Sequence, residues 1–268
     1  MRLTTAVFQV TTKCPYNCPQ CYMKKGNEDL PLEVGMRVID QLLPLGLQAV
    51  QITGGEPLAY APLAELIQYA HGKGLMTFLA TSGFRNSLEQ YRRLKQCGLD
   101  ILCVSLNAID QSVDQLSRDT FEEALVALRD AVDVGLPCVV NTVVSDENVE
   151  RLELLAHYAK RKGAQCVDVL RPVPSHDGVY RPTVSQETVA HIADVVRRNP
   201  SLVCVESCFK EYWSFVNGKP FCCRDAGCTG VFVNADGSFS PCSNLQQFRY
   251  PSYRELVDHR SEWKGGCP

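Results

Sequence analysis

The sequence contains no long apolar run and no run of basic residues. No segment approaches the roughly 20 apolar residues that cross a bilayer as a helix, and no basic segment followed by an apolar stretch opens the chain as a secretion signal would. The formal net charge of -3 and the pI near 6.0 offer no cationic surface to a nucleic acid or an anionic membrane. We therefore expect a cytoplasmic protein with neither kind of partner.

Cysteine, by contrast, is abundant, with 14 in 268 residues. Three cysteines lie in residues 14–21 and seven in residues 204–267, which is a clustered distribution. Because nothing in the sequence marks it for secretion, such clusters indicate metal ligands rather than disulfides. The remaining cysteines are expected to be small buried residues; they are Cys97, Cys103, Cys138 and Cys166.

The first cysteine group occupies residues 14–21, which read CPYNCPQC and follow a strand-like stretch. Three thiolates can ligate three irons of a [4Fe-4S] cluster and leave the fourth iron open to a small chelating molecule. A zinc site or buried thiols are the alternatives, but zinc fingers usually supply ligands in two pairs, and the prolines favour an exposed loop. Cys14, Cys18 and Cys21 are therefore the predicted ligands of an open-iron cluster.

Together with TGGEPL at residues 53–58, this cysteine spacing resembles the radical S-adenosylmethionine (SAM) superfamily over about residues 4–172. The resemblance implies that the open iron chelates SAM and that one electron splits SAM into methionine and a 5′-deoxyadenosyl radical, which abstracts a substrate hydrogen. It also implies a flavodoxin-type or ferredoxin-type electron donor. One departure is visible, because Gln20 stands before the third cysteine where the family usually has an aromatic residue.

Strand-like and helix-like segments alternate through the first two thirds of the chain. β-Branched and aromatic runs predict the strands, and apolar residues at helical spacing predict the helices. The alternation predicts a parallel sheet that right-handed crossovers curl into a partial or full barrel. The predicted strands are residues 4–12, 47–53, 75–81, 99–106, 136–144 and 165–171, and the predicted helices are residues 33–45, 61–72, 87–97, 119–134 and 147–162.

The resemblance narrows this expectation to an α/β fold with a six-stranded (βα)6 partial TIM barrel, whose active site lies at the carboxyl ends of the strands. A chain with 45% hydrophobic residues and this length can bury one sizeable core and a small appended module. We expect the barrel core at 1–173, a linker with a helix at 174–203, and a small cysteine-rich hairpin and helix module at 204–268.

The resemblance also assigns SAM contacts to residues at the predicted strand ends. Gly54, Gly55, Glu56 and Pro57 would bind the SAM amino group, and Ser82 lies in a comparable turn after the third strand. Residues at later strand ends would contact the ribose, the methionyl carboxylate and the adenine; they are Ser105, Asn107, Arg118, Asn141, Leu170 and Arg171.

Several of these later residues have a plainer alternative. Arg118 could be a surface cation at the start of the helix predicted at 119–134, and Leu170 could simply pack in the core. Asn141 and Arg171 could face solvent from their strands.

The second cysteine group lies around a predicted hairpin, in which NADG at residues 234–237 separates two short strand-like stretches. The spacing of Cys222, Cys228 and Cys242, with Cys267 farther on, resembles the auxiliary-cluster half of SPASM and twitch extensions. The resemblance implies one auxiliary [4Fe-4S] cluster with four protein ligands, which suits electron transfer because no iron is left open.

Three further tail cysteines have no fixed place in this ligand set. Only the spacing favours Cys222 over its neighbour Cys223 as a cluster ligand. Cys223 is our candidate for the thiol that returns a hydrogen atom to a substrate radical. Cys204 and Cys208 could pack in the core, act as a lone alternative ligand or belong to a second metal site.

Two kinds of reaction fit these motifs. The first is modification of a ribosomally made peptide by epimerisation, thioether formation or carbon-carbon crosslinking. The second is dehydrogenation or epimerisation of an aminoglycoside-like or other small polyol substrate. A non-enzymatic electron carrier or iron-sulfur scaffold is disfavoured, because a carrier has no need of the GGEP segment. The sequence leaves the substrate itself, peptide or small molecule, unspecified.

Overall fold

The computed structural model describes residues 3–85, 87–221, 223 and 226–263, and its strands form one sheet. Nine strands follow the order β7-β6-β5-β4-β3-β2-β1-β8-β9, and neighbours are parallel except β8 and β9. The strands are β1 (Thr5–Gln9), β2 (Ala49–Thr53), β3 (Met76–Thr81), β4 (Ile101–Ser105), β5 (Cys138–Val143), β6 (Val167–Leu170), β7 (Val203–Val205), β8 (Gly230–Val233) and β9 (Phe239–Ser240).

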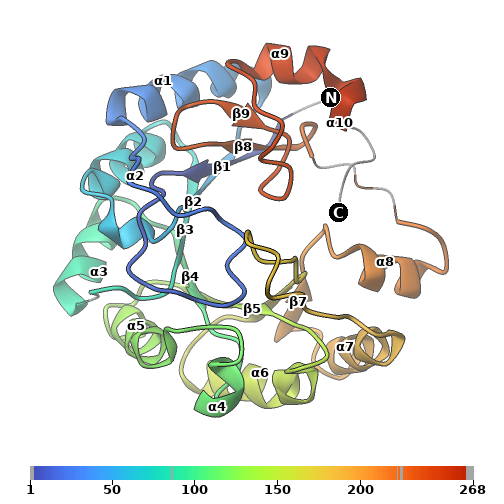
Figure 1. The fold of residues 1–268 in the computed structure, drawn as a ribbon. Coiled ribbons are helices and arrows are strands. Elements are labelled where there is room, and N and C mark those ends of the chain that lie inside the picture. Colours follow the sequence, from blue (N-terminus) through green and yellow to red (C-terminus); the bar gives the residue numbers. More distant parts are fainter. Residues whose placement is uncertain (1–2, 86, 222, 224–225, 264–268) are drawn as a thin grey trace.

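The helices lie around the outside of the curled sheet, as Figure 1 shows. No helix in the described ranges combines the length and apolar character needed to cross a membrane. The helices are α1 (Leu32–Leu42), α2 (Leu63–Gly72), α3 (Leu88–Gln96), α4 (Gln111–Asp114), α5 (Phe121–Asp133), α6 (Leu152–Arg161), α7 (Gln186–Arg198), α8 (Lys210–Asn217), α9 (Tyr253–Asp258) and α10 (Arg260–Trp263), and 3₁₀ turns occupy Leu43–Leu45, Pro57–Ala59 and Val149–Arg151.

Local sequence explains where several helices begin. Ser87, Ser185 and Ser252 precede α3, α7 and α9, and each hydroxyl accepts a hydrogen bond from a backbone N–H in the first turn. Such caps satisfy one of the N–H groups that a helix leaves unpaired at its start. The crossover helices therefore begin at fixed points after the strand ends.

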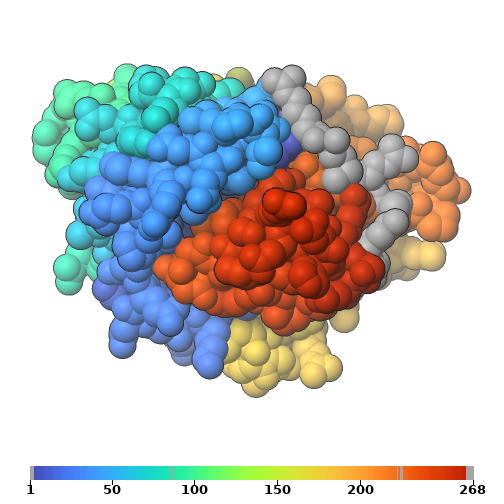
Figure 2. Space-filling model, turned by 90° about the horizontal axis from the view of Figure 1, so that it is seen from above, coloured from blue at the N-terminus to red at the C-terminus, as the bar shows by residue number. Residues whose placement is uncertain are grey.

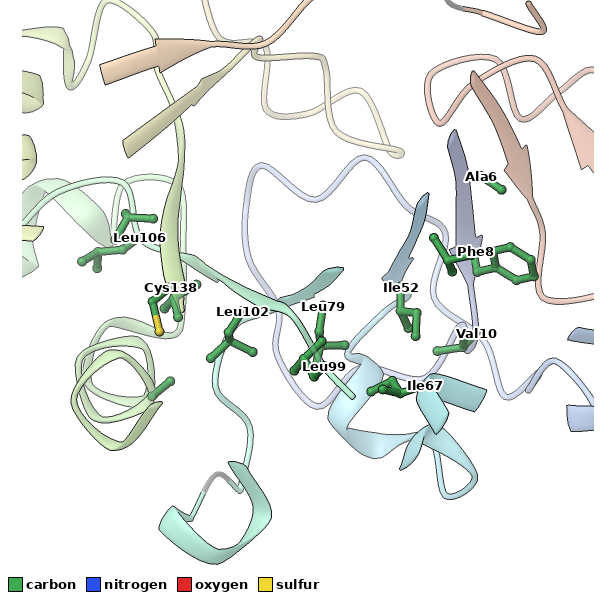
Figure 3. Packing of buried hydrophobic residues seen from close by; sticks show 14 of the residues in the cluster. Ala6, Phe8, Val10, Ile52, Ile67, Leu79, Leu99, Leu102, Leu106 and Cys138 are labelled. Atoms are coloured by element: carbon green, nitrogen blue, oxygen red, sulfur yellow. The ribbon is translucent and has the colours of Figure 1, made fainter. Parts of the chain in front are cut away.

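The two faces of the sheet differ in burial. Ile52, Leu79 and Leu102 are 0% exposed, and Figure 3 shows them in the layer between the strands and the outer helices. The alternating residues of the same strands are mostly half-buried, as are Ala49, Gln51 and Thr53 of β2. Because successive strand residues face opposite sides, the half-buried set lines the inner face of the barrel. A candidate site at the barrel mouth therefore has a partly accessible interior beneath it.

The prediction of six strands is wrong, because the described residues form a sheet of nine strands. A six-stranded sheet would leave the backbone groups of β1 and β6 unpaired at its two edges. Val203–Val205 pair with β6 after the crossover helix α7, and Gly230–Val233 pair in parallel with β1. The helix placed in a linker is thus the crossover of another strand-helix-strand unit, and the predicted hairpin extends the barrel sheet.

Candidate active site

The first cysteine group lies on a loop that leaves the carboxyl end of β1. Its stem is closed by backbone hydrogen bonds that join Val10 and Thr12 to residues 26–30. The cysteines of residues 14–21 are all half-buried at the tip of this loop. The loop therefore presents its thiols at the barrel mouth, as a ligand set open to a small molecule requires.

The three thiols are close enough to affect one another. Burial raises the pKa of Cys14 to about 11, and the neighbouring charge of Cys18 also raises it. Burial likewise raises the pKa of Cys18, with a further contribution from Cys21, whereas the positive charge of Arg118 opposes the change. Metal binding to such thiols would displace their protons, because the thiolate is the ligand.

The donor set of residues 14–21 is compatible with a cluster, because cysteine thiolates are the usual ligands of a [4Fe-4S] cluster. In the ranges that the structure describes, no three His, Cys, Asp or Glu side chains are grouped closely enough to hold a metal ion. Zinc holds its sulfur ligands at about 2.3 Å from one centre, whereas a [4Fe-4S] cluster distributes its cysteines over separate irons. The preference for a cluster over zinc at residues 14–21 therefore continues to rest on the sequence motif.

The glycines of the GGEP segment lie against the stem of the cysteine loop. Gly55 N–H donates to the Thr11 carbonyl at 2.7 Å, and Glu56 N–H donates to the Lys13 carbonyl at 2.8 Å. A Cβ on Gly55 would stand 2.3 Å from the Lys13 carbonyl oxygen, and one on Gly54 would stand 2.8 Å from that of Thr11. Both positions need glycine because two backbone segments meet here.

The carboxylate of Glu56 is held entirely by the protein. It accepts hydrogen bonds from Thr81 Oγ1 at 2.6 Å, Ser82 N–H at 2.9 Å and Leu58 N–H at 3.0 Å. The side chain is 1% exposed, and burial raises its pKa while these hydrogen bonds oppose the rise. Glu56 thus joins the end of β2 to the end of β3, with Pro57 opening the 3₁₀ turn between β2 and α2.

Asn107 connects the cysteine loop to two other segments. Its amide nitrogen donates to Gln20 Oε1 at 3.0 Å and to Ser117 Oγ at 2.6 Å, and its amide oxygen accepts from Val143 N–H at 2.9 Å. Gln20 N–H also donates to the Ser117 carbonyl at 3.2 Å. The residue that replaces the usual aromatic therefore anchors the loop through two hydrogen bonds, a role that its identity alone did not suggest.

Two buried charged groups beside this network have unused hydrogen-bonding atoms. Among the described residues, Arg118 Nε and Asp114 Oδ2 are sealed from solvent without a partner. The Arg118 charge acts on Cys18, Glu56 and Asp114, which locates the guanidinium among all three. A buried donor without a partner is costly, so a ligand with a carboxylate fits this point. Asp114 lies on α4, a short helix between the strand predicted at 99–106 and the helix predicted at 119–134.

The remaining predicted SAM contacts divide into two groups. Ser105, Asn141 and Leu170 lie at or near the carboxyl ends of β4, β5 and β6 and are buried or half-buried. Arg171 instead forms an ion pair with Glu211 of α8, with Nε 3.2 Å from a carboxylate oxygen, and its side chain is 8% exposed. The structure therefore brings Arg171 to the tail, where its guanidinium is bound by a carboxylate.

The tail hairpin brings two of the predicted auxiliary ligands together. Gly227 N–H donates to the Pro241 carbonyl at 2.8 Å, so the residues directly before Cys228 and Cys242 lie side by side. Cys228 is buried and Cys242 and Cys223 are half-buried. Cys222 and Cys267 lie outside the described residues, so the set of four ligands stays a prediction.

The tail also contacts the N-terminal region at two places, Tyr22 and Val34. The hydroxyls of Tyr22 and Ser243 are hydrogen-bonded, and the charges of Cys21 and Cys242 both act on the Tyr22 phenol, whose pKa burial raises. At the other side of the hairpin, a Cβ on Gly237 would stand 2.8 Å from a methyl of Val34. Figure 2 shows the orange and red C-terminal segment packed against the blue N-terminal part. The two cysteine groups thus lie on neighbouring segments.

Comparison with known proteins agrees with this geometry. The model of the radical SAM superfamily matches residues 8–159, which is more than half of the chain. By fold, the chain is similar to SuiB of Streptococcus suis, with a TM-score of 0.78 at 16% identity over 96% of this chain and 65% of SuiB. It therefore spans less than two thirds of the length of SuiB.

Two other solved structures share the fold at similar identity. The protein anSMEcpe with bound AdoMet matches with a TM-score of 0.70 at 17% identity over 98% of this chain and 80% of that chain. Methylornithine synthase (PylB) matches with a TM-score of 0.66 at 16% identity over 97% of this chain and 82% of that chain. The chain belongs to the radical SAM superfamily, whose enzymes use a [4Fe-4S] cluster and SAM.

Proposed function

We propose that Cys14, Cys18 and Cys21 hold the family's cluster and that the chain cleaves SAM to start hydrogen-atom abstraction from a substrate. The observation that carries this proposal is the packing of the cysteine loop on Gly54 and Gly55, beside the buried, unpartnered Nε of Arg118. When bound, the cluster supplies the electron that splits SAM into methionine and a 5′-deoxyadenosyl radical. A flavodoxin-type or ferredoxin-type protein would deliver that electron.

The residues around the loop would then bind and orient SAM. Backbone groups of residues 54–57 would receive its amino group, and Arg118 would pair with its carboxylate through a charge-assisted hydrogen bond. Asn107 would act mainly by fixing the loop through Gln20, since its amide is already used by the protein. The remaining proposed SAM contacts are Ser82, Ser105, Asn141, Leu170 and Arg171, although the ion pair of Arg171 with Glu211 leaves it the weakest member.

For the tail we propose a SPASM-like or twitch-like module at 204–268, joined to the core at 1–173 by residues 174–203. Cys222, Cys228, Cys242 and Cys267 would ligate one auxiliary [4Fe-4S] cluster. The hydrogen bond between Gly227 and Pro241 supports a shared site for two of these ligands. The contact of Tyr22 with Ser243 supports a position of that site next to the first cysteine group.

A ribosomally made peptide is the favoured substrate. Among the structures that share this fold, SuiB binds its precursor peptide SuiA, and anSMEcpe binds the Cp18Cys peptide. A small molecule is the second candidate, because methylornithine synthase shares the fold as well. In that case the reaction would be dehydrogenation or epimerisation of an aminoglycoside-like or other polyol substrate.

The proposed SAM contact of Arg118 predicts a large loss of affinity in Arg118→Ala. Loss of one charge-assisted hydrogen bond costs about 1.5–3 kcal/mol, so the dissociation constant for SAM should rise by about 10–100-fold. Electron paramagnetic resonance of the reduced cluster, titrated with SAM, measures this affinity. Arg197→Ala, at an exposed arginine of α7, serves as the control. Unchanged SAM affinity in Arg118→Ala would remove Arg118 from the site.

The candidate role of Cys223 separates epimerisation from oxidation. An epimerase must return a hydrogen atom to the substrate radical, whereas a dehydrogenase passes on an electron and a proton. The reaction is run in deuterated water. If the enzyme is an epimerase, Cys223→Ala should stop the incorporation of deuterium into the product; if it is a dehydrogenase, Cys223→Ala should leave the oxidation intact. Mass spectrometry of the product checks this, with Cys97→Ala as control. Normal deuterium incorporation by Cys223→Ala would show that another group is the donor.

A further inference from the structure

Four polar residues form a row across the inner face of neighbouring strands. Ser105 of β4 is in register with Asn141 of β5, Asn141 with Asp168 of β6, and Asp168 with Cys204 of β7. The alternating residues on the helix side, such as Val104, Val140 and Val169, are 0% exposed. Because paired residues of a parallel sheet share a face, all four side chains of the row line the barrel interior.

The row has hydrogen-bonding capacity that the protein does not use. Within the described part of the chain, no hydrogen bond reaches the side chains of Ser105, Asn141 or Asp168, and none of their polar atoms is sealed from solvent. Cys204 is exposed. The Cys204 thiol is hydrogen-bonded with that of Cys166, so Ser105, Asn141 and Asp168 are the unpaired members of the row. Polar groups of this kind are normally paired in proteins, and in the accessible interior these three are available to a ligand.

The end of the row at Asp168 carries uncompensated negative charge. Burial raises the pKa of Asp168 to about 6, and no cation of the described residues opposes the rise. Burial also raises the pKa of Glu206, to about 7, and the charge of Asp168 adds to it. Arg171, whose charge acts on Glu206, is already paired with Glu211. A positively charged group is therefore the missing partner at this end.

We propose that Asp168 and Cys204 line the substrate subsite and that Asp168 binds a protonated amine of the substrate. This inference rests on the proposed function, because Ser105 and Asn141 at the other end of the row are assigned to SAM. A substrate amine on Asp168 would then lie one or two strands from SAM, within the same interior face. A lysine side chain of a peptide and an amino group of an aminocyclitol share this chemistry.

The test uses Cys204 as a reporter in the reconstituted enzyme with SAM. Alkylation of Cys204 by iodoacetamide is followed by peptide mass spectrometry. The alkylation rate of each variant is measured with and without a small-molecule probe of the subsite. The amine probes are Nα-acetyl-L-lysine amide and 2-deoxystreptamine, and their uncharged counterparts are Nα-acetyl-L-norleucine amide and myo-inositol. Comparison within each variant removes any effect of the substitution on the intrinsic reactivity of the thiol.

An amine probe should slow alkylation of Cys204 several-fold in the wild type, and its uncharged counterpart should not. The effect should vanish in Asp168→Asn, return at least in part in Asp168→Glu, and persist in Asp133→Asn, which removes an exposed carboxyl on α5. Thermal melting establishes that each variant is folded. The probe that protects better, lysine amide or aminocyclitol, identifies the source of the amine.

Equal protection by charged and uncharged probes, protection that survives Asp168→Asn, or no protection by either amine would overturn the inference. Formation of 5′-deoxyadenosine from SAM is measured in the same preparation. If that reaction is absent, the proposed function fails; if it proceeds while the amines leave Cys204 unprotected, only the substrate subsite fails.

Discussion

Replacement of Cys14, Cys18 and Cys21 together by alanine is expected to abolish 5′-deoxyadenosine formation while leaving about four irons in the protein. The first effect follows because no other described thiols lie on the loop beside Gly55 and Arg118. The second follows from the proposed auxiliary cluster, whose ligands are all in the tail. Iron and sulfide are counted after anaerobic reconstitution, and the wild type should hold about eight irons.

A matched control is the substitution of three other cysteines. Cys97, Cys103 and Cys138 are half-buried or buried thiols in the helix and strand regions, so their replacement should leave the iron count unchanged. The auxiliary cluster would be contradicted if the Cys14, Cys18 and Cys21 triple variant bound no iron and the wild type bound only about four irons. The proposed ligands Cys222, Cys228, Cys242 and Cys267 would then be withdrawn.

Gly55→Ala is expected to lower the free energy of unfolding by about 3 kcal/mol or more, near the upper end for overpacking. The added methyl group would stand 2.3 Å from the Lys13 carbonyl oxygen and 3.0 Å from Cys14 Cβ. Neither neighbour is the flexible end of a side chain, so the loop backbone must move away. The same movement would displace Cys14, and the variant should bind less iron than the wild type. Denaturant unfolding and iron analysis check both effects.

Gly72→Ala provides the control for the substitution itself. Gly72 ends α2, and a Cβ there meets nothing within 4 Å. Alanine at a helical position without strain should raise stability by about 0.5–1 kcal/mol. If Gly55→Ala unfolded at the same denaturant concentration as the wild type and kept its iron, the close contact of the two segments could not be the reason for glycine.

The parts of the fold that follow local patterns could be predicted from the sequence. Each of the six predicted strands contains an observed strand, β1 to β6. These strands are marked by β-branched runs, and the helices between them are marked by apolar residues at helical spacing. The loop at residues 14–21 and the turn at residues 54–57 both lie at carboxyl ends of strands, as expected. Specific motifs and simple periodicity carried these predictions.

The outer strands of the sheet could not be predicted, because their partners are remote. Thr4 is hydrogen-bonded to Thr229 beside the pairing of β1 with β8, across 225 positions of sequence. Nothing in the local pattern of residues 230–233 distinguishes pairing with β1 from a separate hairpin. β7 is only three residues long, which is too short for a reliable period.

The same limit applies to the candidate site. Gly54 and Gly55 were expected at the SAM amino group, and the space that a Cβ would fill at each is occupied by the stem of the cysteine loop. Arg171 was expected at SAM, and Glu211, 40 positions away, binds its guanidinium. Asp168 did carry a usable signal, since a charged residue between two valines of a parallel strand is unusual. Its meaning required the register of its neighbours.

The central claim is that the protein cleaves SAM reductively at its first cysteine group. The most direct measurement adds dithionite and SAM to the reconstituted protein without oxygen and quantifies the products by chromatography. Equal amounts of 5′-deoxyadenosine and methionine, formed only with the reductant, are the expected result. A protein that holds its cluster and binds SAM, yet releases no 5′-deoxyadenosine or converts SAM to S-adenosylhomocysteine instead, would contradict the claim.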